Sequence, residues 1–138
     1  MPNENNHYNS MSLEFGKSTK VLSAMIIDDE IDFVRIFEEM LYTLGINVVA
    51  TAYSGKDAVE LYQILVPDIV FLDLMMPEYD GFNALKMIKQ TDPSSKVIIV
   101  TANPEIENIM KLKADALVMK PFDMSEIKKM INWIEQSR

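Results

Sequence analysis

The sequence lacks cysteine altogether, so its 138 residues can form neither a disulfide framework nor a thiolate metal site. It has one histidine, His7, and no further ligands lie near it, which makes it a poor candidate for catalysis or metal binding. The longest apolar runs have the length of strands, and the N-terminus does not have the regions of a signal peptide. We therefore expect a cytoplasmic protein that makes no contact with a membrane.

Positive charge is also scarce. The 13 Lys and Arg residues are outnumbered by 21 Asp and Glu residues, which gives a formal net charge of -8. This balance opposes binding to a polyanion unless basic residues cluster, and no basic cluster stands out. We therefore expect no nucleic acid partner.

The chain divides into two unequal parts. Residues 1–19 are rich in Asn, Ser and charge without a sustained strand or helix period, which predicts a flexible N-terminal extension. Residues 20–138 are expected to form one domain, because this length and an apolar content of 49% for the whole chain are enough for a hydrophobic core.

Apolar runs of strand length alternate with helical patterns from residue 20 onward. Five alternations predict a doubly wound α/β fold, in which a five-stranded parallel sheet carries helices on both faces. The flavodoxin-like strand order 2-1-3-4-5 is favoured for five units, and it places the first and third strands side by side. The expected strands cover residues 21–27, 46–52, 69–72, 96–101 and 116–119, and the expected helices cover 33–44, 54–65, 82–91, a short segment from Pro104, and a last segment capped by Asp123.

Polar side chains follow or end the apolar runs of four predicted strands. Asp73 follows the most apolar of these runs, and the carboxyl ends of parallel strands meet at one edge of the sheet, where ligands bind. Three carboxylates at one edge repel one another unless a cation neutralises them, and hard oxygen ligands suit Mg²⁺. A lysine and a hydroxyl nearby are suited to hold a phosphoryl group carried by one carboxylate. The residues concerned are Asp28, Asp29, Asp73, Thr101 and Lys120.

The order of these motifs resembles the receiver domain of two-component response regulators, in particular chemotaxis regulators. The acidic pair is followed by LDLMMP at residues 72–77, then by Asp80-Gly81, Thr101-Ala102 and Lys120-Pro121-Phe122. The resemblance covers nearly the whole of residues 20–138. It implies a stand-alone receiver domain of a phosphorelay, which is a signalling module and not an enzyme.

The resemblance also implies roles for individual residues in phosphorylation. Asp73 would be the nucleophile that accepts a phosphoryl group from a phosphohistidine in a reaction that needs Mg²⁺. Thr101 would then move to bond a phosphoryl oxygen, and Lys120 would pair with the phosphoryl group. In such domains the peptide bond between Lys120 and Pro121 is typically cis.

For the metal, the resemblance implies a set of oxygen ligands. Asp29 would bind Mg²⁺ directly and Asp28 largely through water, while Asp73 and the backbone carbonyl of Met75 would complete the protein ligands. Two positions would tune the lifetime of the phosphoryl group in this family: the Met75 side chain could shield it, and Asn103 could orient a hydrolytic water.

The sequence departs from the family pattern in two places. Receiver domains usually carry Tyr or Phe three residues before the lysine, and here Leu117 occupies that position. The segment from Thr101 to Lys120 is also a few residues shorter than the family norm. Our hypothesis is that the loop after Thr101 rearranges its backbone in place of a rotating aromatic side chain.

The resemblance implies two kinds of protein partner. A sensor histidine kinase or a histidine phosphotransfer protein would dock over the pocket, and a downstream protein target would read the switch. Phe33 belongs either to the docking surface or to the core, because a helix presents only one stripe to its sheet. The candidate contact residues are Phe33, Arg35, Ile36, Pro121 and Phe122.

Two other classes of protein remain as alternatives. An aspartate-nucleophile phosphatase would need a second acid two residues beyond the nucleophile, and Met75 stands there. A non-phosphorylated flavodoxin-like module, such as an electron carrier, would need a donor-rich loop after the first strand to bind the flavin phosphate. Asp28, Asp29 and Glu30 would repel that phosphate instead.

Overall fold

The computed structural model of the protein describes residues 21–77, 80–102 and 113–136. The strands and helices predicted for these residues are confirmed, whereas the extension at 1–19 and the helix expected from Pro104 lie outside the described residues. In chain order the elements are β1 (Ser23–Ile27), α2 (Ile31–Thr43), β2 (Asn47–Ala52), α3 (Gly55–Leu65), β3 (Ile69–Leu72), α4 (Asp80–Thr91), β4 (Val97–Thr101), β5 (Ala116–Met119) and α6 (Met124–Gln136).

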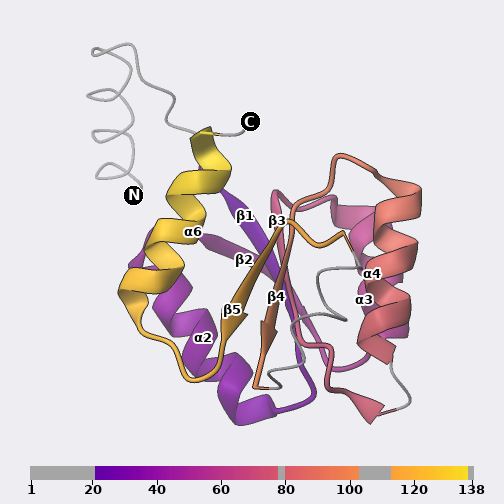
Figure 1. Cartoon of the computed structure of the whole chain (residues 1–138), viewed down its shortest axis with the longest axis horizontal. Helices are drawn as coiled ribbons and strands as arrows, with labels where there is room; N and C mark the ends of the chain where they lie inside the picture. Colours follow the sequence, from indigo (N-terminus) through magenta and orange to yellow (C-terminus); the bar gives the residue numbers. More distant parts are fainter. Residues whose placement is uncertain (1–20, 78–79, 103–112, 137–138) are drawn as a thin grey trace, which may run out of the picture.

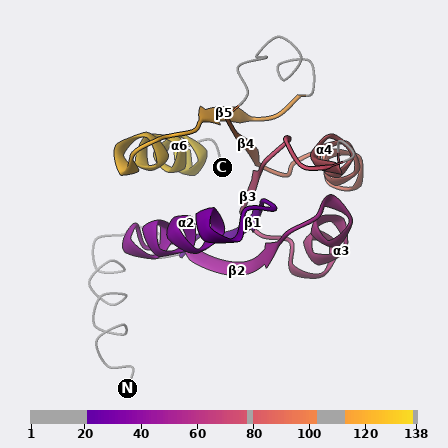
Figure 2. The same cartoon turned by 90° about the horizontal axis from the view of Figure 1, so that it is seen from below.

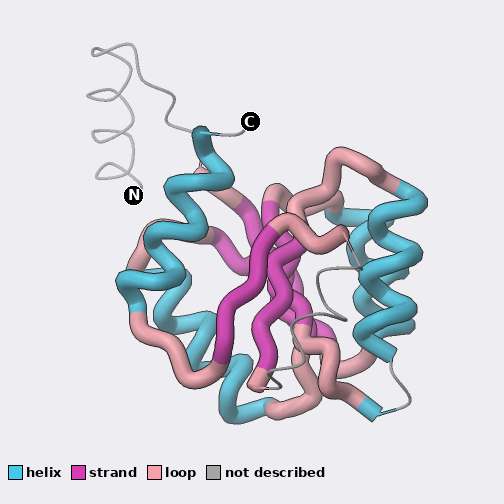
Figure 3. Tube along the Cα trace, in the orientation of Figure 1, coloured by secondary structure: helices cyan, strands magenta, loops and turns pink. Residues whose placement is uncertain are grey.

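All five strands form one parallel sheet in the order β2-β1-β3-β4-β5, which confirms the predicted order. Helices α2 and α6 cover one face of the sheet, and α3 and α4 cover the other (Figures 1 and 2). The strands therefore run through the middle of the domain with helices on either side, as Figure 3 shows in magenta and cyan. This arrangement is the doubly wound α/β fold expected from the alternation.

The central strands are buried on both faces. Every residue of β3 and β4 is buried, as expected for parallel strands covered by helices on both sides. Successive side chains point to opposite faces, so Phe71 packs beside Phe37 of α2 while Leu72 packs in the core under α3 and α4. The hydrophobic clusters on the two faces hold the sheet in place and so position the residues at the strand ends.

Local sequence signals explain where the helices begin and end. The Ser54 hydroxyl accepts a hydrogen bond from the Asp57 amide at the start of α3, and the Asp123 carboxylate accepts one from the Glu126 amide at the start of α6. Helix α2 is followed by Gly45, whose φ of 82° suits glycine. No helix in the described part of the chain is long and apolar enough to cross a membrane.

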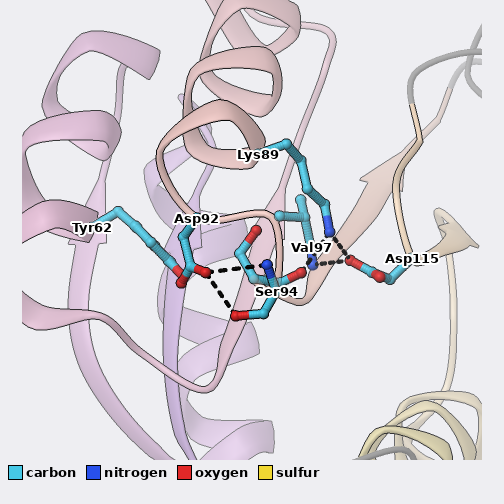
Figure 4. Close-up of polar contacts among 7 residues, drawn as sticks. Tyr62, Lys89, Asp92, Ser94, Val97 and Asp115 are labelled. Atoms are coloured by element: carbon cyan, nitrogen blue, oxygen red, sulfur yellow. Dashed lines mark hydrogen bonds and ion pairs between the residues drawn. The ribbon is translucent and has the colours of Figure 1, made fainter.

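A polar network joins α3 and α4 to the amino end of β4 (Figure 4). The Tyr62 hydroxyl donates to the Asp92 carboxylate over 2.6 Å. Lys89 forms an ion pair with Asp115 at 2.6 Å, and the same carboxylate oxygen accepts from the Val97 amide at 2.7 Å. The network thus fixes the amino edge of the sheet, which is the edge opposite the strand ends that carry Asp28 and Asp73.

Candidate functional site

The polar residues predicted from the sequence meet at the carboxyl edge of the sheet. Asp28 follows β1 and Asp73 follows β3, and the Asp73 amide donates to the carbonyl of Ile27 over 2.9 Å. Thr101 is the last residue of β4, and its carbonyl accepts from the Lys120 amide, just beyond β5, over 2.8 Å. Neighbouring strands therefore bring these residues together although they are far apart in the sequence.

Most of these side chains are buried, which is unusual for their type. Asp28, Asp73 and Thr101 are 1%, 4% and 0% exposed, and Ser95 is the remaining buried polar residue in the described ranges. Asp29, in contrast, is exposed. A buried charge is costly unless a partner compensates it, so two buried carboxylates imply a nearby cation.

Lys120 provides positive charge inside the structure. Its ammonium lies 2.7 Å from Asp28 Oδ2, 3.2 Å from Glu30 Oε1 and 3.6 Å from Asp73 Oδ2. The ammonium also lies 4.0 Å from the ring centroid of Phe33. Burial alone would lower the pKa of Lys120, but the surrounding carboxylates outweigh it and raise the pKa. Lys120 therefore remains charged.

The Asp73 carboxyl titrates above its usual range. Burial raises its pKa most, and the charges of Asp28 and Asp29 add to the rise. The Met75 amide, which donates to Asp73 Oδ1 over 2.9 Å, and the Lys120 ammonium lower the pKa. Ionised Asp73 therefore gains from any further cation that enters the cluster.

The acidic cluster fits a magnesium ion. Asp28, Asp29 and Asp73 each offer a carboxylate oxygen, and these oxygens lie within 4.8 Å of one another. Three hard oxygen donors suit Mg²⁺ better than metals that prefer sulfur or nitrogen. Asp29 is exposed, so the cluster is reached by solvent at this residue. For Met75, the structure gives an exposed side chain and a hydrogen bond that its backbone N–H donates to Asp73 Oδ1, and the role of its carbonyl stays a prediction.

The Asp80-Gly81 pair has a steric role that the sequence pattern does not reveal. A Cβ at Gly81 would collide with the Asp73 carbonyl oxygen and would lie 2.8 Å from Leu74 Cα. The Asp80 carboxylate accepts a hydrogen bond from the Gly55 amide at the start of α3. These contacts set the path of the chain after Asp73 and connect that loop to the neighbouring helix.

The predicted docking residues divide into two groups. Phe33 and Phe122 are half-buried against the core, with ring centroids 5.9 Å apart, so Phe33 belongs to both the core and the surroundings of Lys120. Arg35, Ile36 and Pro121 are exposed, and their part in docking stays a prediction.

The remaining expectations have mixed outcomes. The peptide bond between Lys120 and Pro121 is cis, as expected. Leu117 is half-buried and packs against the core under α3 and α4, while Asn103 lies outside the described residues. Sequence reasoning missed the contact of Glu30 with Lys120. The usable signal was a third acid directly after Asp28-Asp29, at the end of the same strand.

Comparisons with known proteins agree with this geometry. The family model of the response regulator receiver domain matches residues 24–132. The chemotaxis protein CheY of Thermotoga maritima is 31% identical over 115 residues, which are 81% of this chain and 96% of that protein. A two-component response regulator of the LuxR family from Aurantimonas sp. SI85-9A1 superposes with a TM-score of 0.79 at 27% identity, covering 86% of this chain and 88% of that one. The CheX-CheY-BeF3-Mg+2 complex from Borrelia burgdorferi gives a TM-score of 0.76 at 26% identity, covering 82% and 88%. The chain therefore belongs to the family of response regulator receiver domains.

Proposed function

We propose that this chain is a phosphorylation-controlled switch in which Asp73 accepts a phosphoryl group from a phosphohistidine. Phosphorylation-based switching is the general function of the family, whose members are signalling domains and not classical enzymes. The observation that carries the proposal is the buried Asp73 carboxylate, which lies among other acids and 3.6 Å from the Lys120 ammonium.

In the transfer step Asp73 acts as the nucleophile. A carboxylate oxygen forms a bond to phosphorus while the bond from phosphorus to the imidazole nitrogen breaks, and the electron pair of that bond stays on the nitrogen. The Met75 amide holds Asp73 Oδ1, which fixes the rotation of the carboxylate before the donor arrives. The other ring nitrogen of the donor carries a proton, so the products are a phosphoaspartate and a neutral histidine on the donor.

Lys120 and Thr101 would bind the transferred group. The ammonium of Lys120 neutralises a phosphoryl oxygen, and the hydroxyl of Thr101, at the end of β4, donates to another. In the resting state Lys120 lies closer to Asp28 than to Asp73, so its ammonium must shift toward the new group. The shift and the approach of Thr101 are how the chain would register phosphorylation.

The cofactor that fits is Mg²⁺. Asp28, Asp29 and Asp73 would hold it, with the Met75 carbonyl as a further protein ligand. When bound, the ion would neutralise charge on the phosphoryl oxygens.

The proposed partners are proteins. A sensor histidine kinase or a histidine phosphotransfer protein would supply the phosphoryl group, and a downstream protein would bind the switched form. Pro121 follows Lys120, and Arg35 and Ile36 follow Phe33 in α2; all three are exposed and suit such a docking surface. The net charge of -8 supports a protein partner over nucleic acid.

Intact mass spectrometry tests the proposal. The wild-type protein is incubated with acetyl phosphate and Mg²⁺, next to Asp73→Asn and to Asp57→Asn, which changes an exposed acid at the start of α3. The wild type and Asp57→Asn should gain the mass of one phosphoryl group, and EDTA should abolish the gain. Asp73→Asn should gain none. A wild type that stays unmodified with both acetyl phosphate and a phosphorylated histidine protein would contradict the proposal.

A further inference from the structure

The side chain of Glu30 does not cap α2, although the residue stands at the start of that helix. Glu30 is the N-cap residue of the helix, yet its side chain makes no capping hydrogen bond. Its amide donates to Asp28 Oδ1 over 2.9 Å, and its carbonyl accepts from Val34, so its backbone serves the turn. The side chain is 67% exposed, and its carboxylate lies 3.2 Å from the Lys120 ammonium. The Glu30 carboxylate therefore binds Lys120 and does not cap the start of the helix.

The Lys120 ammonium is held from three sides. Asp28 binds it most closely at 2.7 Å, Glu30 lies at 3.2 Å, and the ring of Phe33 lies at 4.0 Å. Asp73 is the most distant of its carboxylate partners at 3.6 Å, which exceeds normal hydrogen-bond length. The resting position of the ammonium is thus set by groups other than the phosphoacceptor.

We propose that Glu30 is a positioning residue that competes with the group on Asp73 for the Lys120 ammonium and so weakens the site's affinity for a phosphoryl group. This inference rests on the proposed function. A phosphoryl group must draw Lys120 away from a carboxylate that already neutralises it. Glu30 also adds a negative charge beside the Lys120 ammonium, and like charge disfavours an anion there.

The two effects act in the same direction. Removing the charge of Glu30 releases the Lys120 ammonium and lowers the repulsion between Glu30 and the phosphoryl group. Each of these changes favours the phosphorylated form. Glu30 is mostly exposed, which limits the effect, because exposed ion pairs contribute little. We expect the affinity for a phosphoryl analogue to rise roughly two- to five-fold in Glu30→Gln, the range that exposed pairs usually give.

Beryllofluoride is the suitable probe, since it adds to a carboxylate as a phosphoryl analogue and reports an equilibrium. Its dissociation constant would be measured by fluorine NMR at fixed Mg²⁺ for the wild type, Glu30→Gln and Asp32→Asn. Asp32 is an exposed acid in the first turn of the same helix, so its replacement removes the same charge near the site but outside the Lys120 contacts described above. Thermal melts confirm that all three proteins are folded.

We expect beryllofluoride to bind more tightly to Glu30→Gln alone. The difference in dissociation constant between Glu30→Gln and the wild type should shrink as salt is added, because salt screens the exposed Glu30 carboxylate. Equal affinities in Glu30→Gln and the wild type would overturn the inference, and so would an equal gain in Asp32→Asn, because that result reflects net charge alone. These outcomes differ from a failure of the proposed function, in which the wild type itself takes no phosphoryl group in the mass experiment.

Discussion

Replacing Tyr62 with Phe tests whether the polar network at the amino edge of the sheet stabilises the domain. The ring of Tyr62 is 2% exposed and would keep its packing in the variant. The substitution removes the hydroxyl, which donates to the Asp92 carboxylate over 2.6 Å. The experiment thus isolates one hydrogen bond between α3 and the turn that follows α4.

The expected loss in the free energy of unfolding depends on the charge of Asp92, which accepts the hydrogen bond from the Tyr62 hydroxyl. Hydrogen bonds to charged groups contribute about 1.5–3 kcal/mol to the free energy of unfolding, and water at the half-exposed Asp92 replaces part of this. We expect a loss of about 1–2 kcal/mol for Tyr62→Phe. For a domain of this size the melting temperature should fall by roughly 4–8 °C.

The difference between wild type and variant should depend on pH. The hydrogen bond from Tyr62 chiefly lowers the pKa of Asp92 below its ordinary value of 3.8. A lowered pKa stabilises the folded state above that ordinary value, and this stability is lost as pH falls through the lower value. The pKa of Tyr62 is raised, mostly by burial and then by the hydrogen bond to Asp92. The stability that comes from the protonated Tyr62 hydroxyl is therefore lost only as pH rises above the ordinary value of 10.0. The difference should therefore be largest near neutral pH and narrow below about pH 4.

Urea unfolding followed by circular dichroism measures these differences. Tyr42→Phe is the matched control, because Tyr42 is 81% exposed and should change the free energy of unfolding by less than about 0.5 kcal/mol. If Tyr62→Phe were as stable as Tyr42→Phe, or if the difference did not narrow in acid, the reasoning about this hydrogen bond would be wrong.

Four further predictions concern the site and the same network. Gly81→Ala should lower the free energy of unfolding, measured by urea unfolding, by about 1–3 kcal/mol, because the new Cβ collides with the backbone after β3. Without metal, Asp73→Asn should melt above the wild type at pH 7, because burial and neighbouring acids raise the pKa of Asp73 and its ionised form costs stability once pH exceeds 3.8. Mg²⁺ at ten times its dissociation constant should stabilise the wild type by about 1.4 kcal/mol and the variant less, as thermal melts would show. Lys89→Gln should cost about 1 kcal/mol, because it breaks the half-buried ion pair with Asp115.

The sequence predicted the fold and the cluster around Asp73 because both depend on local signals. Apolar runs locate the strands, and a carboxylate directly after a run lies at the shared edge. Long-range side-chain pairs have no such signal. Glu30 and Lys120 are 90 positions apart, and although the third acid after Asp28-Asp29 marks Glu30 as a residue of the same edge, it does not identify Lys120 as its partner. Phe33 could not be assigned from helical period either, because it lies at the border of the buried stripe, where it contacts both core rings and Lys120.

The position of Lys120 has a consequence for how the domain folds and responds. Its ammonium acts as a built-in counter-ion for Asp28 and Asp73, so the chain does not have to recruit a metal in order to bury two acids. Structural zinc domains show the opposite arrangement, in which the metal supplies the folding energy. An incoming cation would therefore add to a pocket that Lys120 already partly neutralises. We expect the cluster to bind that cation less tightly than the same carboxylates would without Lys120, and we expect the domain to fold without it.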